Sequence, residues 1–506
     1  MAPVAAGTDD RQVQVRFTTR LPAHLTVPST PFAVPVRLTR YGLSEVINTL
    51  LGRDAPQPFD FIVDGRLLRS SLRKCLLTSA LSTERVIPIE YTLAVRPPSA
   101  SLAAPHEDWV SAVSAALPSA IVSGSYDSHV RLFSVPPASA AATTAGPSAS
   151  TDATAAAGAG GADGGAGSGS ASCIQVAAAH SDAVTHIAAL PAANAFVSSS
   201  KDRTLRLWQL SGDSSEPSTG PSSLRAAVVA VMRGHAAAVQ CAAVHARTNK
   251  LASGGWDSAI KLWSLPKLGA KAGARGGEEG RAGGDGEGGT GEEAEGEEGA
   301  GEGAEGRGQA RKRVRTAAGS VEAEGVELSP DLSLEGHSQC VAALAWPSSN
   351  SPLFSVSWDH SLRSWDVEAA ASVSVRTSAH PLLAVAAGGG GMASLAAVGG
   401  AHPTILLWDM RSATSVLSPS VQLLGHTDWI SSLSWSPSNP LHLLSSSYDG
   451  SLKIWDLRSS VPLHTVKAHS DKVLCADWWK GGDAVVSGGA DNHLRIFTHQ
   501  SSFPAA

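Results

Sequence analysis

The stretch SGGWDSAIKLW at residues 253–263 decides the fold, because similar stretches recur along most of the 506-residue chain. In each one, small residues lead to a turn, usually at an Asp, and an aromatic residue stands six positions after the turn position. The other copies are SGSYDSHVRLF (123–133), SSSKDRTLRLW (198–208), SVSWDHSLRSW (355–365), AVGGAHPTILLW (397–408), SSSYDGSLKIW (445–455) and SGGADNHLRIF (487–497). Seven copies indicate a repeat architecture.

Each copy has the pattern of a strand, a tight turn and a second strand. The Asp carboxylate can accept hydrogen bonds from backbone N–H groups of the turn. The residues after the turn alternate between apolar and polar, as in a half-buried strand. Two further apolar runs lie upstream, for example WISSLSWSP (429–437) and HLLSSS (442–447). Each repeat therefore supplies about four short strands.

The spacing of the repeats identifies their type. His337, His380, His426 and His469 stand upstream of successive copies at intervals of 43, 46 and 43 residues. This period matches the roughly 40–45 residues of a WD40 repeat. With Trp-Asp at 365–366, 408–409 and 455–456, the chain resembles the WD40 family over about 106–497. Seven blades predict a closed β-propeller, so the chain should be mainly β.

Ser, His and Asp recur together in the repeats and resemble catalytic triads. Seven near-copies of one catalytic site are implausible, whereas repeat positions serve packing between neighbouring units. The WD40 resemblance implies a structural relay inside each blade, and we expect no enzyme. The relay residues singled out are His235, Ser253, Asp257 and Trp263, together with His426, Asp449 and Trp455.

Three blades depart from the relay pattern. His402 replaces the Asp of the fifth copy, and Phe133 and Phe497 replace the final Trp of the first and seventh copies. We therefore expect these three blades to be less well braced than the others. Only nine residues follow Phe497, so the outer strand of the last blade should come from residues near 93–105.

Two low-complexity stretches interrupt the repeats, and both are predicted to be disordered. Residues 136–172 are rich in Ala, Ser and Gly, and 265–325 separate the third and fourth blades. Between Glu278 and Glu305 eleven acidic residues face one basic residue, so the rest of the chain, whose total charge is −6, carries about +4. A basic cluster follows, which indicates either a nuclear localisation signal or a solvated charge cluster: Arg311, Lys312, Arg313 and Arg315.

The remaining composition excludes several classes. The five scattered cysteines predict buried free thiols in a reducing compartment, without zinc or disulfides. No run of 18 apolar residues and no secretory signal pattern is visible. We therefore expect neither a membrane partner nor a small-molecule substrate.

The segment 12–96 differs in kind from the repeats. It is predicted to contain strands at 13–17, 32–38, 59–63, 66–68 and 86–95, a helix at 41–51 stopped by Gly52, and a short helix at 71–77. Asp64-Gly65 is the turn of a hairpin. This order predicts a small α+β ubiquitin-like domain. No Gly-Gly tail follows it, so we expect a docking module.

The amino-acid sequence of this segment is more specific to one family than its fold is. VRFTTRLP, PVRLTRYGLSEVIN, PFDFIVDGRLLRSSL and IEYTLAVRPPS, followed by EDWV at 107–110, resemble the YTM-type WD-repeat ribosome biogenesis proteins, the WD-repeat subunits of the PeBoW complex. The resemblance is close over about 12–110, and the propeller continues it. The acidic-then-basic insertion also fits that family and favours nuclear import. The insertion at 136–172 departs from the pattern.

The resemblance implies a non-enzymatic scaffold of the nucleus, nucleolus and nucleoplasm, active in rRNA processing and in maturation of the large-subunit preribosome. The propeller would bind a block-of-proliferation-type WD-repeat protein, which in turn binds pescadillo. The ubiquitin-like domain would bind the AAA ATPase midasin, which releases the complex from the pre-ribosomal particle. The chain would carry no cofactor of its own and would share Mg²⁺ at the midasin interface.

A cation shared across an interface needs an exposed carboxylate on one side. Mg²⁺ prefers oxygen ligands and keeps positions for water, one of which a partner's carboxylate can take. The family motif falls on Leu81-Ser82-Thr83-Glu84, and the resemblance implies that Glu84 is this ligand. On spacing alone, Glu84 is an ordinary solvated side chain.

The propeller's partner surface is predicted from aromatic residues. Tyr126, Trp256, Trp358 and Tyr448 stand directly before the turn Asp in four copies, on loops expected to share a rim with the upstream His loops. Large aromatics on loops are typical interface anchors. Local packing over a neighbouring blade is the alternative, and direct RNA contact stays open.

The predicted organisation places the appended domain before the repeats. Its parts are a disordered 1–11, the ubiquitin-like domain 12–96, the closure segment and first blade 97–135, the insertion 136–172, blades 2 and 3 at 173–264, the insertion 265–325, and blades 4 to 7 at 326–500. The alternative function is a WD40 substrate-receptor adaptor of a ubiquitin ligase, since a ubiquitin-like domain adjoins the propeller.

Overall fold

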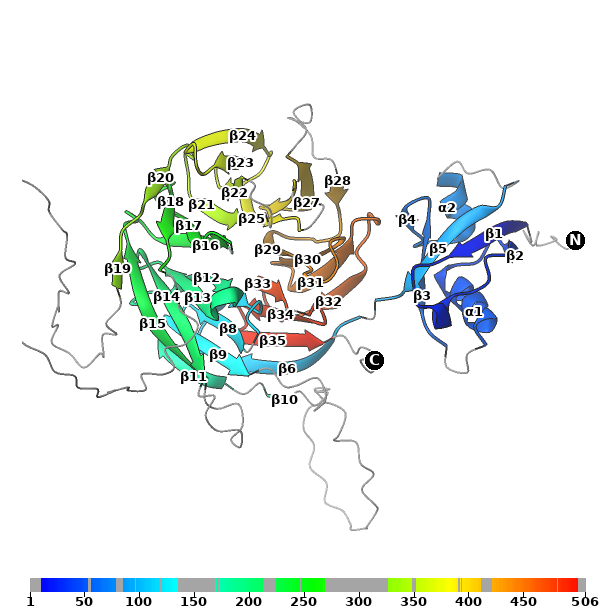
Figure 1. Ribbon diagram of the computed structural model, residues 1–506, viewed down its shortest axis with the longest axis horizontal. Coiled ribbons are helices and arrows are strands. Elements are labelled where there is room, and N and C mark those ends of the chain that lie inside the picture. Colours follow the sequence, from blue (N-terminus) through cyan, green and yellow to red (C-terminus); the bar gives the residue numbers. More distant parts are fainter. Residues whose placement is uncertain are drawn as a thin grey trace, which may run out of the picture.

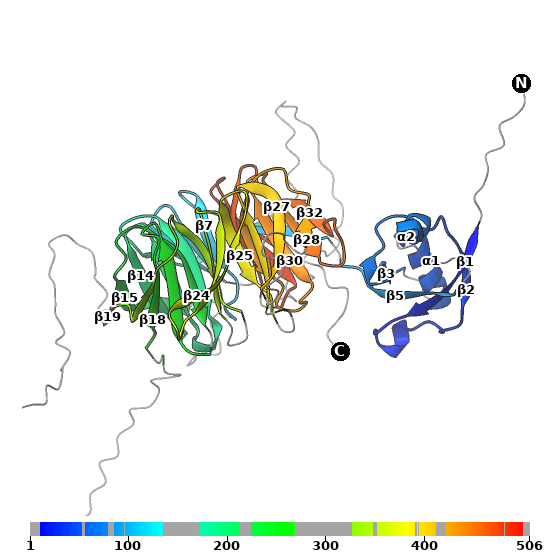
Figure 2. The same ribbon diagram turned by 90° about the horizontal axis from the view of Figure 1, so that it is seen from above.

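The computed structural model describes two bodies, a small N-terminal domain and a large ring (Figure 1). The described residues are 11–52, 56–78, 85–95, 97–118, 120–134, 169–170, 173–212, 224–245, 247–266, 268, 326–347, 352–389, 392, 394–410, 421–479 and 481–498. Glu84 and the basic cluster at 311–315 lie outside them. Seen from above, the small domain lies beside the ring (Figure 2).

The N-terminal domain is a five-stranded sheet with two helices and has the ubiquitin-like order β2-β1-β5-β3-β4. The first and last strands, β1 and β5, run parallel at its centre. Phe17, Phe59, Phe61 and Tyr91 are fully buried in its core. The elements are β1 (Gln12–Thr18), η1 (Ala23–Leu25), β2 (Phe32–Pro35), α1 (Arg40–Leu50), β3 (Phe59–Val63), β4 (Arg66–Leu67), α2 (Leu72–Thr78) and β5 (Ile87–Leu93).

The second strand of this domain is shorter than the sequence predicts. It was expected to reach residue 38, but β2 ends at Pro35. The carbonyl oxygens of Val36 and Leu38 accept the N–H groups of Arg73 and Leu72 at 2.8 Å, so this stretch caps the start of α2. The alternation of apolar residues that predicted a strand therefore continues past Pro35, into residues whose carbonyl oxygens bond a helix instead of a neighbouring strand.

Among the described residues, the rest of the chain forms seven sheets arranged as the blades of a ring (Figure 1). The inner strands contact one another in the cyclic order β7, β12, β16, β21, β25, β29, β33 and back to β7. Blades 1 to 3 contain β7 (Val110–Ser114), β8 (Ala120–Ser125), β9 (His129–Ser134) and β11 (Cys173–Ala178); β12 (Val184–Leu190), η3 (Pro191–Ala193), β13 (Ala195–Ser200), β14 (Thr204–Gly212) and β15 (Leu224–Arg233); and β16 (Val239–His245), β17 (Lys250–Gly255), β18 (Ile260–Ser264) and β20 (Leu332–Leu334).

Blades 4 to 7 repeat the arrangement with shorter connections. They contain β21 (Val341–Ala345), β22 (Leu353–Ser357), β23 (Ser361–Asp366) and β24 (Ala371–Thr377); β25 (Leu382–Ala387), β26 (Leu395–Gly400), β27 (His402–Asp409) and β28 (Val421–Leu423); β29 (Ile430–Trp435), β30 (His442–Ser447), β31 (Ser451–Asp456) and β32 (His464–Lys467); and β33 (Val473–Trp478), β34 (Ala484–Gly489), β35 (His493–Thr498) and β6 (Ser99–Pro105).

The ring is closed by a strand from before the first blade. β6 pairs antiparallel with β35, so Ser99–Pro105 supply the fourth strand of blade 7. The sequence placed this strand near 93–105. Closure joins the two ends of the propeller and leaves the N-terminal domain only a few residues, 94–98, from the closing strand.

Two extra strands pair in parallel at the outer edges of blades, where the predicted insertions end. β19 (Val326–Leu328) lies along β15 of blade 2, and β10 (Gly169–Ser170) lies along β6 of blade 7. Residues 169–170 therefore correct the prediction that all of 136–172 is disordered. Covering these outer edges reduces unwanted strand pairing.

Neighbouring blades are tied together by hydroxyl groups on the inner strands. The Ser111, Thr185 and Ser431 hydroxyls each donate to a carbonyl oxygen of the next blade, that of Val184, Val239 and Val473. The indole N–H groups of Trp346, Trp435 and Trp478 bond back to the preceding blade. These bonds join blade 1 to 2, 2 to 3, 3 to 4, 5 to 6 and 6 to 7.

The cysteines are free thiols but are not all buried. Cys241, Cys340 and Cys475 are buried, whereas Cys75 is half-buried and Cys173 is exposed. Cys173 was expected to be buried, but it begins β11, the outer strand of blade 1. In the described part of the chain, no helix has the length and apolar character needed to cross a membrane.

Candidate partner-binding surfaces

Four side chains in blade 3 form the relay predicted from its sequence. His235 Nδ1 lies 2.8 Å from Asp257 Oδ2, and its Nε2 lies 2.7 Å from Ser253 Oγ. The indole N–H of Trp263 donates to the same hydroxyl oxygen at 2.8 Å. Because a carboxylate only accepts, Nδ1 carries the imidazole proton and Ser253 donates its own to Nε2.

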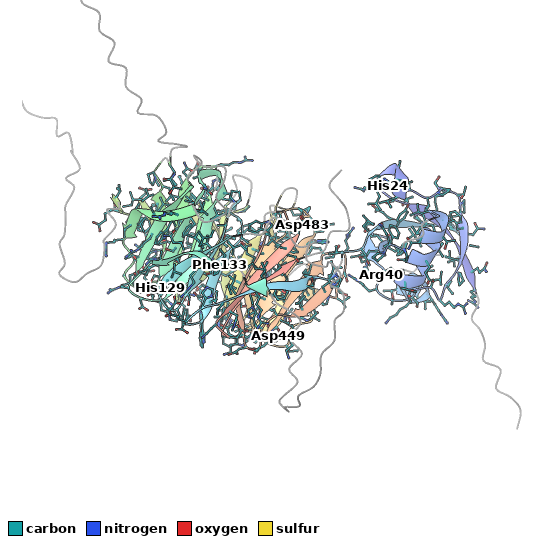
Figure 3. The ribbon with its side chains drawn as sticks, turned by 90° about the horizontal axis from the view of Figure 1, so that it is seen from below. His24, Arg40, His129, Phe133, Asp449 and Asp483 are labelled. Atoms are coloured by element: carbon teal, nitrogen blue, oxygen red, sulfur yellow. The ribbon has the colours of Figure 1, made fainter. Side chains whose placement is uncertain are left out.

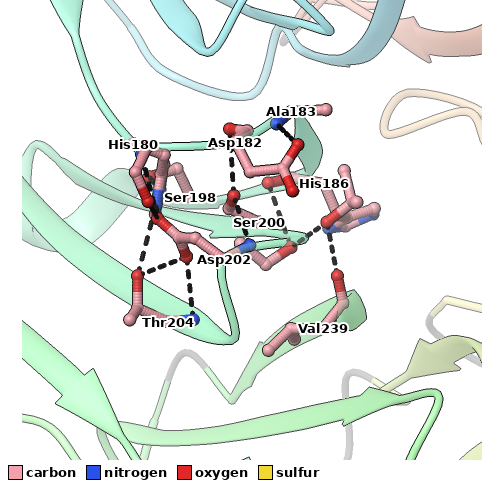
Figure 4. A network of polar contacts seen from close by, with 12 residues as sticks. His180, Asp182, Ala183, His186, Ser198, Ser200, Asp202, Thr204 and Val239 are labelled. Carbon is pink, nitrogen blue, oxygen red and sulfur yellow. Dashed lines mark hydrogen bonds and ion pairs between the residues drawn. The ribbon is translucent and has the colours of Figure 1, made fainter. Parts of the chain in front are cut away.

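The same relay stands in blades 2, 4 and 6. Figure 4 shows the blade 2 network around His180, Ser198 and Asp202, in which Thr204 adds a bond to the Asp. His426 bonds Asp449 at 2.8 Å and Ser445 at 2.7 Å, and Trp455 donates to Ser445. The blade 4 set is His337, Ser355, Asp359 and Trp365.

Charges in the relay are stabilised by hydrogen bonds. Burial opposes ionisation of Asp359, but bonds from Ser361 and His337 outweigh it and lower the pKa of that carboxyl to about 2. Burial lowers the pKa of His180, His337 and His426, against the pull of their aspartates. The resting relay is therefore a neutral imidazole beside a carboxylate.

The relay serine is unsuited to catalysis. Ser253, Ser355 and Ser445 are completely buried, so no substrate atom can approach their hydroxyls. Each hydroxyl also receives an indole N–H, which fixes it as a structural bridge between two rings. The geometry therefore braces the blade and supplies no accessible nucleophile.

The three departing blades differ from one another. Blade 7 keeps the His469 bonds to Asp491 and Ser487 at 2.8 Å and lacks only the indole. In blade 1, Arg131 binds Asp127 at 2.7 Å, and His106 bonds Ser123 and the carbonyl oxygen of Ala104 in place of an Asp. His106 was missed in the sequence; it stands 17 residues before its serine, whereas the spacing is 18 in four other blades and 19 in blade 6.

Blade 5 has a pair of histidines in place of the relay. The rings of His380 and His402 stack with centroids 4.7 Å apart and planes inclined by 15°. No group of three or more His, Cys, Asp or Glu side chains in the described part of the chain is placed to hold a metal ion.

One rim of the ring is built from two positions per blade, which we call the rim pair. The residue before the turn Asp, or its equivalent, donates its N–H to the carbonyl oxygen of the residue before the inner strand, at 2.9–3.1 Å in every blade. The pairs, in blade order, are Tyr126–Trp109, Lys201–Ala183, Trp256–Ala238, Trp358–Cys340, Ala401–Pro381, Tyr448–Trp429 and Ala490–Lys472. The backbone bond is constant, so the side chains are free to differ.

The four predicted aromatics occupy these rim pairs and form three clusters. Tyr126 packs on Trp109 with ring centroids 5.6 Å apart, and Tyr448 packs on Trp429 at 5.8 Å. Trp256 and Trp358, from neighbouring blades, lie 6.0 Å apart. The side chain of Trp256 is 56% exposed, Trp109 43% and Trp429 38%.

Lysines complete two of the clusters. Lys201 Nζ lies 4.2 Å from the centre of the Tyr126 ring, and Lys472 Nζ lies 5.2 Å from that of Tyr448. Each lysine comes from the next blade, so part of the predicted local packing over a neighbouring blade is present. Exposure of the tryptophans leaves apolar surface for a partner.

Trp109 and Trp429 were missed as rim residues, although the sequence carries a signal for both. Asp-Trp precedes a β-branched residue at the start of an inner strand in EDWV (107–110) and TDWI (427–430). Asp108 and Asp428 each accept the N–H of the following Trp at 2.7 Å. The repeated pattern distinguishes blades 1 and 6.

The centre of the ring contains a cavity of about 300 Å³ lined by all seven inner strands. Asp477 in its wall accepts the N–H of Ala115 and the hydroxyl of Ser434, both at 3.0 Å, and so links blades 6, 7 and 1. Burial raises the pKa of Asp477 despite these bonds. The carboxylate thus joins blades across the site of ring closure.

The described residues on either side of the predicted cation ligand are exposed. Glu84 lies between α2 and β5, outside the described residues. Leu77, near the end of α2, is 75% exposed, and Val86, directly before β5, is also exposed. The localisation residues Arg311, Lys312, Arg313 and Arg315 are likewise outside the described ranges.

Family models match both parts of the chain. The NLE (NUC135) domain matches residues 13–76, and the WD domain, G-beta repeat, matches 171–209, 227–264, 328–366, 417–456 and 460–498. The repeat matches contain the relay strands of blades 2, 3, 4, 6 and 7. Of blades 1 and 5, where the His–Asp bond is missing, they contain only the outer strands β11 and β28.

Curated relatives match almost the whole chain. The "Ribosome biogenesis protein WDR12 homolog" of Oryza sativa subsp. japonica is 36% identical over 500 residues, covering 97% of both chains. The protein of the same name in Chlamydomonas reinhardtii is 35% identical, covering 97% of this chain and 98% of its own. "Ribosome biogenesis protein YTM1" of Eremothecium gossypii is 31% identical, covering 96% and 97%.

Proposed function

This chain belongs to the family of WDR12 and YTM1 ribosome biogenesis proteins, and we propose that it is a non-enzymatic scaffold of a nucleolar complex that matures the large ribosomal subunit. Family membership gives it a role in ribosome biogenesis. The observation that carries the proposal is the match over 97% of the chain, which includes the ubiquitin-like domain as well as the ring.

The ring is proposed to bind a block-of-proliferation-type WD-repeat protein, which bridges to pescadillo. The rim pairs support this part of the proposal, because a constant backbone frame presents exposed tryptophans on one side of a rigid ring. Trp256→Ala should weaken binding of the purified partner about tenfold or more in calorimetry. Val373→Ala, at an exposed apolar residue of the outer strand β24, is the control. Equal affinities of the two variants for the partner would show that Trp256 is not part of the interface.

The ubiquitin-like domain is proposed to bind the adhesion domain of midasin through Glu84 and a shared Mg²⁺. Exposed Leu77 and Val86 beside that segment support it, since apolar contacts can flank a charged ligand. Glu84→Ala should abolish Mg²⁺-dependent binding and Glu84→Asp should weaken it, while Glu45→Ala on α1 should have no effect. Undiminished Mg²⁺-dependent binding by Glu84→Ala would refute the assignment.

Localisation is proposed to be nuclear, nucleolar and nucleoplasmic, with Arg311, Lys312, Arg313 and Arg315 directing import. A tagged chain should give a nucleolar signal and sediment with large-subunit precursors, and replacing the four basic residues by Ala should leave it in the cytoplasm. A cytosolic wild-type signal with co-purifying cullin subunits would instead support a ubiquitin-ligase adaptor.

A further inference from the structure

The ubiquitin-like domain meets the ring at the turn between β31 and β32 of blade 6. The backbone N–H of Leu67, in edge strand β4, donates to the carbonyl oxygen of Arg458 at 3.1 Å. His464 Nε2, at the start of β32, lies 2.8 Å from the carbonyl oxygen of Val95, in the link between β5 and β6. In Figure 1, β4 is on the side of the domain that faces the ring.

Asp456 fixes the shape of this turn. Its side chain is almost completely buried and accepts the backbone N–H of Arg458 at 2.8 Å and two guanidinium N–H groups at 2.9 and 2.6 Å. His442 adds a contact at 3.4 Å. Burial opposes ionisation of Asp456, but these bonds outweigh it and lower its pKa. The carbonyl group of Arg458 is therefore held in a defined position.

A poorly satisfied charge lies at the same contact. The guanidinium of Arg69, just after β4, is attracted by the carboxylates of Asp60 and Asp456. Its Nε and Nη2 atoms are nevertheless buried without a hydrogen-bond partner. Burial lowers the pKa of Arg69, against the attraction of both carboxylates. Arg40, which pairs with Asp60 at 3.1 Å, is on the side of the domain nearest the ring (Figure 3). The guanidinium of Arg69 is therefore less well solvated in this contact than it would be in water.

The contact is polar rather than a continuation of either core. The apolar cluster of the ubiquitin-like domain is separate from those of blades 5, 6 and 7. Domains in one chain move relative to each other unless their interface is large and hydrophobic. A few hydrogen bonds and an under-solvated guanidinium favour a contact that opens.

We propose that blade 6 holds the ubiquitin-like domain in a releasable docked position, with the Asp456–Arg458 turn as the latch. In the docked state the edge of β4 is covered, because the N–H of Leu67 is used by Arg458. Release breaks the bonds of Leu67 and Val95 and leaves the domain tethered through 94–98 to β6, the strand that closes the ring. This proposal holds whichever partner binds the ubiquitin-like domain.

Residue-resolved amide hydrogen exchange on the full chain tests the latch. The Leu67 amide is bonded across the contact, whereas the neighbouring Leu68 amide is bonded to Phe61 inside the domain at 2.8 Å and serves as an internal control. In the wild type, Leu67 should exchange about tenfold or more slowly than an unbonded amide. Asp456→Asn and His464→Ala should each accelerate exchange at Leu67 without changing it at Leu68.

Asp366→Asn is the matched control for the turn. Asp366 is the corresponding residue of blade 4 and caps its turn through the N–H groups of Glu368 and Ala369, away from the ubiquitin-like domain. This variant should leave Leu67 exchange unchanged, and Arg69→Met should slow it by removing the under-solvated charge. Rapid exchange at Leu67 in the wild type, or no response to both Asp456→Asn and His464→Ala, would overturn the proposal.

Discussion

At the scale of single residues, the buried serine of the relay is the position on which each blade most depends. Ser253 satisfies two buried ring nitrogens at once, those of His235 and Trp263. Leaving a buried donor or acceptor unsatisfied costs roughly 1–3 kcal/mol per group. The relay therefore concentrates stability in a side chain that sequence motifs alone would nominate as a nucleophile.

Ser253→Ala should lower the free energy of unfolding by about 2–4 kcal/mol, because it leaves both buried ring nitrogens without a hydrogen-bond partner. Ser264→Ala, at the exposed end of β18 in the same blade, should change it by less than about 0.5 kcal/mol. Chemical denaturation of the two variants beside the wild type provides the measurement. Similar losses in both would show that the relay does not brace the blade.

Acid should destabilise the ring through its buried histidines. Burial lowers the pKa of His106 to about 4, with Arg131 adding to the effect, whereas an unfolded histidine titrates near about 6.5. Between these values the unfolded chain binds the extra proton, so stability is complete above about pH 6.5 and falls as the pH drops toward 4.

His106→Gln should flatten this pH dependence by on the order of 2–3 kcal/mol between pH 7 and 4, since glutamine does not titrate. Thermal unfolding followed across that range measures the effect. The exposed residue His24 supplies the control His24→Gln, which should keep the wild-type slope. An unchanged slope in His106→Gln would contradict the assignment.

At the scale of elements, ring closure by β6 is the feature that links the two bodies. β6 covers the edge of β35, and an uncovered edge strand invites aggregation. A chain beginning at residue 99 should form a monomeric ring, whereas one beginning at residue 106 should melt at a lower temperature and aggregate. Size-exclusion chromatography and thermal melting compare them, and identical behaviour would show that β6 is dispensable.

Most elements of this chain were predictable because local patterns and long-range packing agree in them. The Asp64-Gly65 turn has φ of 51° and 72°, as its sequence indicates, and β3 spans the predicted residues. β2 was predicted too long because the carbonyl oxygens of Val36 and Leu38 accept N–H groups from α2, a contact between distant segments. β10 and β19 have no local pattern, since an edge strand of two or three residues is defined by its neighbour.

The candidate surfaces were predictable only in part, for the same reason. Tyr126, Trp256, Trp358 and Tyr448 stood out by their position before the turn. Their partners in the rim pairs come from another loop, and Lys201 and Lys472 come from the next blade, so the clusters exist only in three dimensions. The contact between Leu67 and Arg458 joins residues almost four hundred positions apart and has no sequence signal.

At the scale of the whole molecule, a braced ring carries a separate ubiquitin-like domain, attached next to the strand that closes the ring. The repeats supply rigidity, and we propose that the residues that differ between repeats bind the partners. This arrangement fits a scaffold, because the repeated serines are buried and the exposed tryptophans Trp109, Trp256 and Trp429 lie on one rim of the ring.

The central claim is that this scaffold serves maturation of the large ribosomal subunit, and depletion of the protein followed by measurement of pre-rRNA tests it most directly. Precursors of the large-subunit rRNAs should accumulate, small-subunit precursors should mature normally, and the wild-type chain should restore processing. Unchanged large-subunit processing after complete depletion would contradict the account.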